Sequence, residues 1–150
     1  NIGAFRKFHH ETIGYNNRLD TLQASILIHK LKQLDKLNKN RIIISNYYFK
    51  KINNLKILFL KYSKNSVYHQ FVIRVKNRKK LINYINKNKI EIGLHYPHTI
   101  NQMKYYKDNF KKLKFKNAEK LASECLSLPI DPMLKKKEIE FIINKINNFK

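Results

Sequence analysis

At 150 residues the chain is long enough for one domain with a sizeable core, and a hydrophobic fraction of 43% with nine Phe and nine Tyr argues against a disordered chain. Lys and Arg number 32 against 10 Asp and Glu, so the formal net charge is +22 and nucleic acid or an anionic membrane surface has to be considered. The basic residues are mostly Lys, spread among many Asn and Ile, which favours a general compositional bias over a dedicated binding stripe.

The scarcity of long apolar runs and of cysteine indicates the cellular compartment. No apolar run approaches the roughly 20 residues that span a bilayer. The single cysteine, Cys125, excludes an intrachain disulfide and fits a reducing compartment, so we expect a cytoplasmic protein and a buried, unreactive Cys125. The chain starts without Met and without the apolar core of a signal peptide, and we expect it to be a fragment of a longer protein.

The first predicted element after a connecting segment is a long helix. Asp20 and Gln23 form a capping-box pattern, and apolar residues then recur three and four apart. This period predicts one amphipathic helix over residues 19–52. Residues 1–13 show no clear period.

Strands and shorter helices follow. Residues 57–60 and 67–75 are rich in β-branched and aromatic residues and predict two strands; on the inner face of the second, His69 is expected to be a hydrogen-bonded core histidine. The pattern then predicts a helix over 77–88, a strand over 90–96, a short helix over 103–107, a helix over 117–124, a strand-like segment at 126–128 and a helix over 138–149. This order predicts an α+β fold, in which a long N-terminal helix precedes a small mixed or antiparallel sheet with helices packed on one side.

Two polar stretches are candidates for binding. In residues 14–20, Asn16 offers an amide donor and Arg18 a rigid cationic fork, which suit a phosphate or a carboxylate, although an ordinary loop-to-helix junction has the same composition. At the end of the strand predicted over 90–96, His95, Tyr96 and His98 lie where binding residues are common, and simple packing remains an equal alternative. The sequence shows no metal-ligand spacing and no glycine-rich phosphate loop.

Several motifs, taken together, resemble the DegT/StrS-type sugar aminotransferases. Residues 14–24 read GYNNRLDTLQA and resemble the signature G-x-N-x-R-[LM]-D-x-[LI]-Q-A. GLHYP at 93–97 resembles the later G-x-H-Y-P segment, and residues 67–74 are similar to the family's central strand. AEKLA at 118–122 and LSLP at 126–129 match two further elements, so the resemblance covers essentially the whole chain in the family's order.

This resemblance implies a pyridoxal-phosphate enzyme of the aspartate aminotransferase fold, a homodimer that passes an amino group, usually from glutamate, to a nucleotide-linked keto sugar. It implies that Asn16 contacts the cofactor phosphate of the neighbouring subunit with Arg18 beside it, and that His95 and Tyr96 line the sugar-nucleotide pocket. It implies amino-sugar or cell-surface polysaccharide biosynthesis. From the composition and spacing described above, we expect no membrane, metal or nucleic-acid partner. Residues 1–17 would connect to a missing large domain, and 18–150 would form the C-terminal small domain.

The chain also departs from the family. Thr99 and Asn101 stand where Pro and His are usual, while Gln102 agrees, so the sugar stays unidentified. No Lys stands in the family's Schiff-base context; that lysine is expected upstream, and the 150 residues alone are not expected to catalyse transamination. Two alternatives stay open: a non-catalytic basic module that binds anions or nucleic acid, and an inactive gene remnant.

Overall fold

The structure, a computed structural model, describes residues 4–6, 9–15, 17–106, 108, 110 and 113–150. It divides into two compact units, Asn1–Lys36 and Leu37–Lys150, and each is described by itself. The boundary between residues 17 and 18 that the resemblance implies stays a prediction.

The first unit holds a small hairpin and the first turns of a long helix. Strand β1 (Ala4–Arg6) pairs antiparallel with β2 (His9–His10), a pairing that the aperiodic sequence does not predict. Helix α1 (Thr21–Lys51) confirms the long helix predicted over 19–52. Its start is capped by Asp20, whose Oδ1 accepts a hydrogen bond from the backbone N–H of Leu22 at 3.0 Å.

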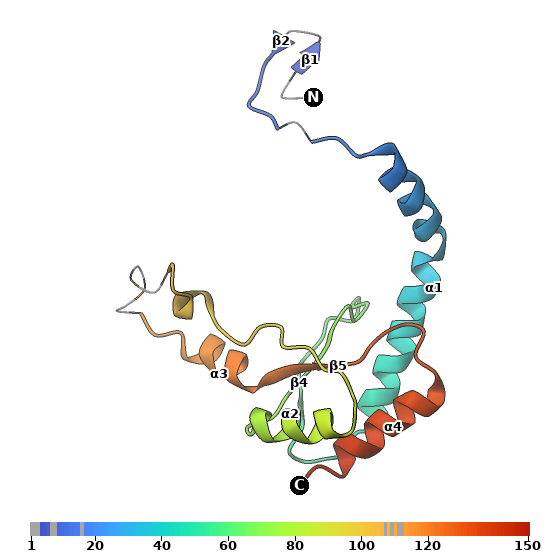
Figure 1. The fold of residues 1–150 in the computed structure, drawn as a ribbon, viewed down its shortest axis with the longest axis vertical. Coiled ribbons are helices and arrows are strands. Elements are labelled where there is room, and N and C mark those ends of the chain that lie inside the picture. Colours follow the sequence, from blue (N-terminus) through green and yellow to red (C-terminus); the bar gives the residue numbers. More distant parts are fainter. Residues whose placement is uncertain (1–3, 7–8, 16, 107, 109, 111–112) are drawn as a thin grey trace. The chain divides into compact units, whose positions relative to one another are not determined.

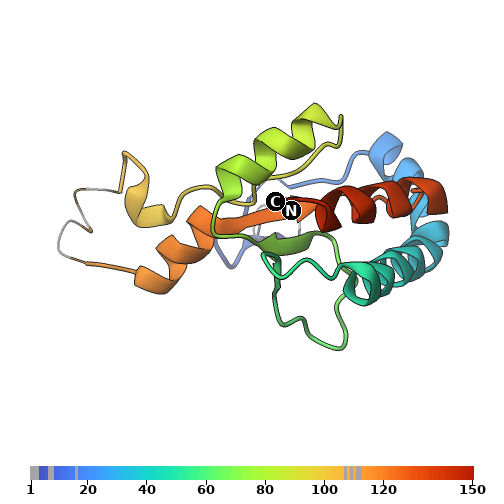
Figure 2. The ribbon, with the colours of Figure 1, turned by 90° about the horizontal axis from the view of Figure 1, so that it is seen from below.

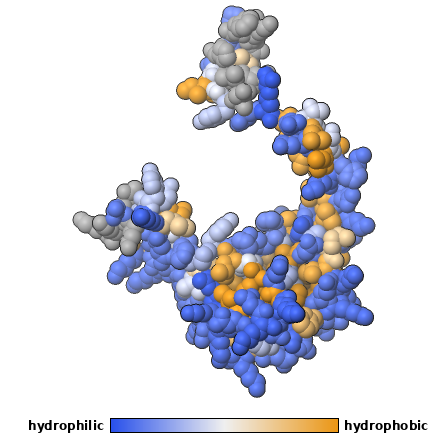
Figure 3. Space-filling model, viewed as in Figure 1, coloured by the Kyte–Doolittle hydropathy of each residue, from blue (hydrophilic) through white to orange (hydrophobic). Residues whose placement is uncertain are grey.

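Apolar side chains on the first turns of α1 are exposed. Leu22 and Leu31 are 70% and 67% exposed, and Figure 3 shows apolar surface on this stretch. We call the exposed set the α1 apolar face; its members are Leu19, Leu22, Ile26, Leu27, Ile28, Leu31 and Leu34. A contiguous apolar surface of this kind is typical of a site where further protein packs.

A three-stranded antiparallel sheet forms the centre of the second unit. The strands β3 (Leu58–Phe59), β4 (Phe71–Arg74) and β5 (Cys125–Leu128) lie in the order β3-β4-β5. In the pairing of β4 with β5, Phe71 lies opposite Leu128 and Ile73 opposite Leu126. Side chains alternate between the two faces of a strand, so these four share one face, and Val72 shares the other with Ser127.

Helices contribute the rest of the core. The second unit contains α2 (Arg78–Lys87), α3 (Lys116–Glu124) and α4 (Lys136–Asn147), which confirm the three helices predicted over 77–88, 117–124 and 138–149. Figures 1 and 2 show α2 and α4 beside the sheet. Their buried residues and those of the last turns of α1 join the sheet in one cluster; its largest fully buried members are Tyr48, Phe71, Ile73, Leu81, Ile85, Leu126 and Ile146. The predicted α+β class is confirmed, and the sheet is antiparallel.

Tyr48 of α1 is a fully buried side chain that carries a hydroxyl group. Its hydroxyl donates to the carbonyl of Pro129 at 2.8 Å, which satisfies a polar group inside the core. Burial raises the pKa of the Tyr48 hydroxyl well above its ordinary value of 10. The cluster therefore holds a neutral, hydrogen-bonded phenol.

Three predicted elements differ in the structure. The strand expected over 67–75 shortens to β4, because Tyr68 takes a φ of 51° that interrupts the extended chain; His69 is exposed, so its prediction as a core histidine is wrong. The strand expected over 90–96 reduces to a single bridge at Gly93. In place of the helix expected over 103–107, a 3₁₀ turn, η1 (Ile100–Gln102), comes earlier and residues 104–106 form turns, while residue 107 lies outside the described residues.

Charged side chains fix α3 and the start of β5 to the neighbouring elements. Arg74 in β4 donates two hydrogen bonds to Oε2 of Glu124, at 2.6 and 3.1 Å. Arg78 in α2 donates to the carbonyl of Cys125 at 3.1 Å and to that of Ala122. Cys125 itself is buried, as predicted.

Candidate functional site

The segment that follows α2 joins the sheet at one point. The backbone N–H of Gly93 donates to the carbonyl of Ser127 at 3.0 Å, and the N–H of Ser127 donates to the carbonyl of Gly93 at 2.8 Å. Because Leu126 and Leu128 face the helices, the pleat of β5 directs Ser127 to the opposite face. The segment from Gly93 onward therefore meets β5 with the Ser127 hydroxyl beside it.

His95 rests on this junction. Its Nδ1 lies 3.0 Å from Oγ of Ser127, a buried side chain. Its ring lies across Gly93, so closely that a Cβ at position 93 would overlap Cε1 of His95 and lie 2.8 Å from Nδ1. Gly93 thus leaves the space that the imidazole fills, and Ser127 fixes the ring's rotation. With Nδ1 engaged, Nε2 is the nitrogen left for a ligand.

Tyr96 stands next to this imidazole. Its ring is edge-on to that of His95, with 5.7 Å between centroids and an interplanar angle of 88°. Tyr96 is 69% exposed, and His98 two residues on is exposed as well. Together Nε2 of His95 and the hydroxyl of Tyr96 offer hydrogen bonding beside aromatic surface, which suits a ligand with several hydroxyl groups.

The two positions that depart from the family's motif lie on η1 and just before it. Asn101 donates to Oε1 of Glu119 at 2.9 Å and so attaches η1 to α3. The Thr99 backbone N–H donates to Oε1 of Gln102 at 3.1 Å, while Oγ1 of Thr99 is buried without a hydrogen-bond partner among the described residues. The side chain of Asn101 therefore has a structural contact.

The other predicted pair belongs to the first unit. Asn16 lies outside the described residues. Arg18 is exposed, and no described residue forms an ion pair or hydrogen bond with its guanidinium. A guanidinium without another partner can bind a phosphate through two parallel N–H groups, so Arg18 fits the phosphate of the cofactor that the resemblance implies.

Within the described residues no cluster of three His, Cys, Asp or Glu could hold a metal ion. No helix in those ranges is both long and apolar enough to cross a membrane.

Ser127 is the residue that sequence reasoning missed. It lies 32 residues after His95, and a hydrogen bond over that separation depends on how β5 and the Gly93 segment pair in space. One signal was available. Ser127 is the hydroxyl-bearing residue of the run Cys125–Leu128, and it lies on the face of the strand opposite that of Leu126 and Leu128. Gly93 was noted only as part of a motif.

Residues 1–147 match the DegT/DnrJ/EryC1/StrS aminotransferase family, and the chain belongs to this family. The resemblance that the motifs indicated is confirmed. The chain is 34% identical over 151 residues to "dTDP-3-amino-3,6-dideoxy-alpha-D-galactopyranose transaminase" of Aneurinibacillus thermoaerophilus, which covers 99% of this chain and 41% of that protein.

Two further proteins are similar to this chain over nearly its whole length. A "UDP-2-acetamido-2-deoxy-3-oxo-D-glucuronate aminotransferase" of Pseudomonas aeruginosa is 30% identical, covering 97% of this chain and 41% of that protein. The crystal structure of S. venezuelae DesV matches with a TM-score of 0.87 at 28% identity, covering 98% of this chain and 41% of that chain. The chain thus spans about two fifths of the length of these relatives.

Proposed function

We propose that this chain is the C-terminal part of a pyridoxal-phosphate-dependent aminotransferase that transfers an amino group, from glutamate, to a nucleotide-linked keto sugar. The observation that carries the proposal is the exposed pair His95 and Tyr96, held on Gly93 and Ser127 within a motif of this family. The names of two relatives support the substrate class, since one mentions a dTDP-linked sugar and the other a UDP-linked sugar.

Arg18 and Asn16 are proposed to hold the cofactor phosphate, in the active site of the neighbouring subunit. No described residue pairs with the guanidinium of Arg18, and this supports the role, because a phosphate dianion would supply a counter-charge. When bound, pyridoxal phosphate supplies the electron sink through which an amino group is exchanged. We place the Schiff-base lysine outside these 150 residues, because no Lys here has the family's sequence context.

His95 and Tyr96 are proposed to bind the sugar nucleotide. Ser127 holds the imidazole so that Nε2 faces the ligand, and Tyr96 adds a hydroxyl that can donate or accept. Both groups bind and orient; neither is assigned a proton-transfer step. A ring fixed in advance loses little conformational freedom on binding, which favours affinity.

We further propose a cytoplasmic homodimer that serves amino-sugar or cell-surface polysaccharide biosynthesis, with residues 1–17 as a connecting segment and 18–150 as the small domain. The α1 apolar face supports an association of subunits, and the free, buried Cys125 fits a reducing compartment. Sedimentation equilibrium of the full-length gene product tests the dimer: a mass of twice the subunit supports it, and a monomer at micromolar concentration contradicts it.

The activity is tested on the full-length gene product that contains these residues. The protein is loaded with pyridoxal phosphate, mixed with L-glutamate, and the 2-oxoglutarate released is measured. We expect about one equivalent per subunit without acceptor and repeated turnover with a panel of dTDP- and UDP-linked keto sugars. If neither glutamate nor glutamine, aspartate or alanine releases its keto acid from the loaded protein, the proposed function is wrong.

A further inference from the structure

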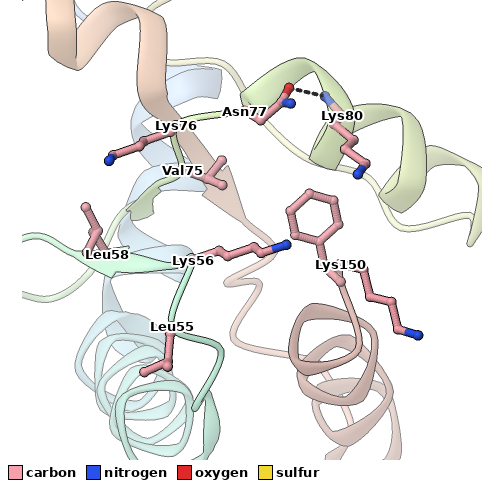
Figure 4. Close-up of a pocket in the computed structure, with 9 residues that line it drawn as sticks. Leu55, Lys56, Leu58, Val75, Lys76, Asn77, Lys80 and Lys150 are labelled. Carbon is pink, nitrogen blue, oxygen red and sulfur yellow. Dashed lines mark hydrogen bonds between the residues drawn. The ribbon is translucent and has the colours of Figure 1, made fainter.

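A hollow in the unit Leu37–Lys150, away from His95 and Tyr96, is lined by lysine and apolar side chains. Its volume is about 580 Å³. It lies between the turn before β3, the first turn of α2 and the end of the chain, as Figure 4 shows. We call it the lysine pocket, after Lys56, Lys76, Lys80 and Lys150 in its wall.

Among the described residues that line the lysine pocket, no acidic side chain balances its charge. None of its four lysines forms an ion pair with a described residue. The basic composition of the chain does not by itself produce such a wall. A second hollow beside α4 has two lysines, Lys89 and Lys137, and three carboxylates, those of Glu91, Asp131 and Glu138. Unbalanced ammonium groups around one hollow repel one another and attract an anion.

Two of the lysines extend into the pocket. Figure 4 shows Lys56 and Lys80 reaching toward each other from the turn before β3 and from α2, while Lys76 points away. Nζ of Lys56 lies 5.8 Å from the ring centroid of Phe149, a buried residue whose ring therefore adds apolar surface under the cation. Lys56 and Lys80 are thus the pair placed to bind one anionic group from two sides.

Apolar surface adjoins these cations. Leu55 is 97% exposed although it is a large aliphatic residue, and it lines the same hollow. A site that offers two free cations beside apolar surface suits a ligand with an anionic and an apolar part. The volume lies within the roughly 300–1,000 Å³ of small-molecule sites, and is small for an extended polymer.

We propose that the lysine pocket binds a small diphosphate that carries an apolar or aromatic group, of which a nucleoside diphosphate is the simplest form. The phosphates lie between Lys56 and Lys80, and the base or other apolar group lies against Leu55. The site shares no residue with the His95 segment, so the proposal does not depend on the proposed function.

The test is a titration of the ¹⁵N-labelled full-length gene product that contains these residues with uridine diphosphate, followed by backbone amide shifts at about 0.15 M salt. We expect saturable shifts at Lys56, Leu58 and Lys80. Pyrophosphate should shift the same amides with lower affinity, and uridine alone should not. Lys56→Gln with Lys80→Gln should weaken binding about tenfold or more, because two charge-assisted contacts are lost.

A matched control removes the same charge elsewhere. Lys64→Gln with Lys87→Gln alters two exposed lysines outside the pocket and should change the affinity less than about twofold, because exposed charges outside the pocket are screened by salt. Equal weakening by the two double variants would show general attraction to a basic protein and overturn the proposal. Shifts confined to the Gly93–His95 segment would do the same. So would shifts of the pocket amides by a mixed-sequence RNA oligonucleotide but not by uridine diphosphate.

A separate variant tests the contact between Leu55 and the apolar part of the ligand. Leu55→Ser changes an almost fully exposed side chain and should leave the fold intact. It should weaken the binding of uridine diphosphate about threefold to tenfold and leave pyrophosphate unchanged. An unchanged affinity for uridine diphosphate would contradict a site for a ligand with an apolar group.

Discussion

Nδ1 of His95 lies 3.0 Å from Oγ of Ser127, and this hydrogen bond spans 32 residues of sequence. It connects an exposed imidazole in a loop to a buried side chain in β5. Since the ring also lies against Gly93, its position is set from two sides. A side chain that could otherwise rotate freely is held with Nε2 available to a ligand.

Ser127→Ala removes the partner of Nδ1. We expect the fold to persist with a loss of about 0.5–1.5 kcal/mol, and the imidazole ¹⁵N shifts of His95 to move, because Nδ1 loses its hydrogen-bond partner. Ser123→Ala is the control, because Ser123 Oγ donates to the Lys120 carbonyl in α3 and not to His95. Imidazole shifts that are the same in wild type, Ser127→Ala and Ser123→Ala would show that Ser127 does not fix the ring.

Gly93→Ala places a methyl group where the His95 ring lies. We expect the unfolding free energy in urea to fall by about 1–3 kcal/mol, the range of an overpacked contact. In the His95→Ala background the same substitution should cost less than about 1 kcal/mol, because the overlapping ring is gone. A cost that is equal in the two backgrounds would mean that the ring of His95 is not what Gly93 accommodates.

The sequence predicted the regular elements well and the site only in part. Helix α1 follows from its apolar period and from Asp20, and α2 from its periodic pattern. In the structure Asn77 caps α2, and its side chain accepts from the backbone N–H of Lys80. Local signals suffice for such elements, because their hydrogen bonds join residues close in sequence. His95 and Tyr96 were indicated by their place at the end of a predicted strand and by a motif of the family.

What the sequence did not predict depends on long-range pairing. The strand expected over 90–96 has only Ser127 as a partner, at Gly93, so strand propensity alone overestimated it. His69 was assigned to the core by alternation, but Tyr68 leaves the extended conformation next to it and ends the alternation. The contact of Ser127 with His95 likewise requires the register of β4 and β5.

Tyr48→Phe should change how stability depends on pH. At pH 7 the variant should be less stable by about 1 kcal/mol, because the hydrogen bond to the Pro129 carbonyl is lost. The folded chain keeps the Tyr48 proton above pH 10, since burial raises its pKa, while the unfolded chain releases it. The contribution of Tyr48 is therefore complete below about pH 10 and falls above it by about 1.4 kcal/mol per pH unit.

Urea unfolding of wild type and Tyr48→Phe between about pH 9 and pH 11 measures this difference. The difference in unfolding free energy between the two proteins should narrow as the pH rises and change sign by about pH 11. Tyr105→Phe serves as the control, because Tyr105 is 83% exposed and removal of its hydroxyl should not alter how the unfolding free energy depends on pH. A gap that stays constant up to pH 11 would show that the folded protein does not protect the Tyr48 proton.

We propose that Arg18 and Asn16 bind the cofactor while His95 binds the sugar nucleotide. The most direct test measures retained pyridoxal phosphate after dialysis, and KM for a dTDP- or UDP-linked keto sugar, in Arg18→Ala, Asn16→Ala and His95→Ala of the full-length enzyme. We predict that the first two weaken cofactor binding by about 1–3 kcal/mol, and that His95→Ala keeps the cofactor and raises KM about tenfold. Unchanged cofactor retention in Arg18→Ala and Asn16→Ala, or cofactor loss with an unchanged KM in His95→Ala, would contradict the account.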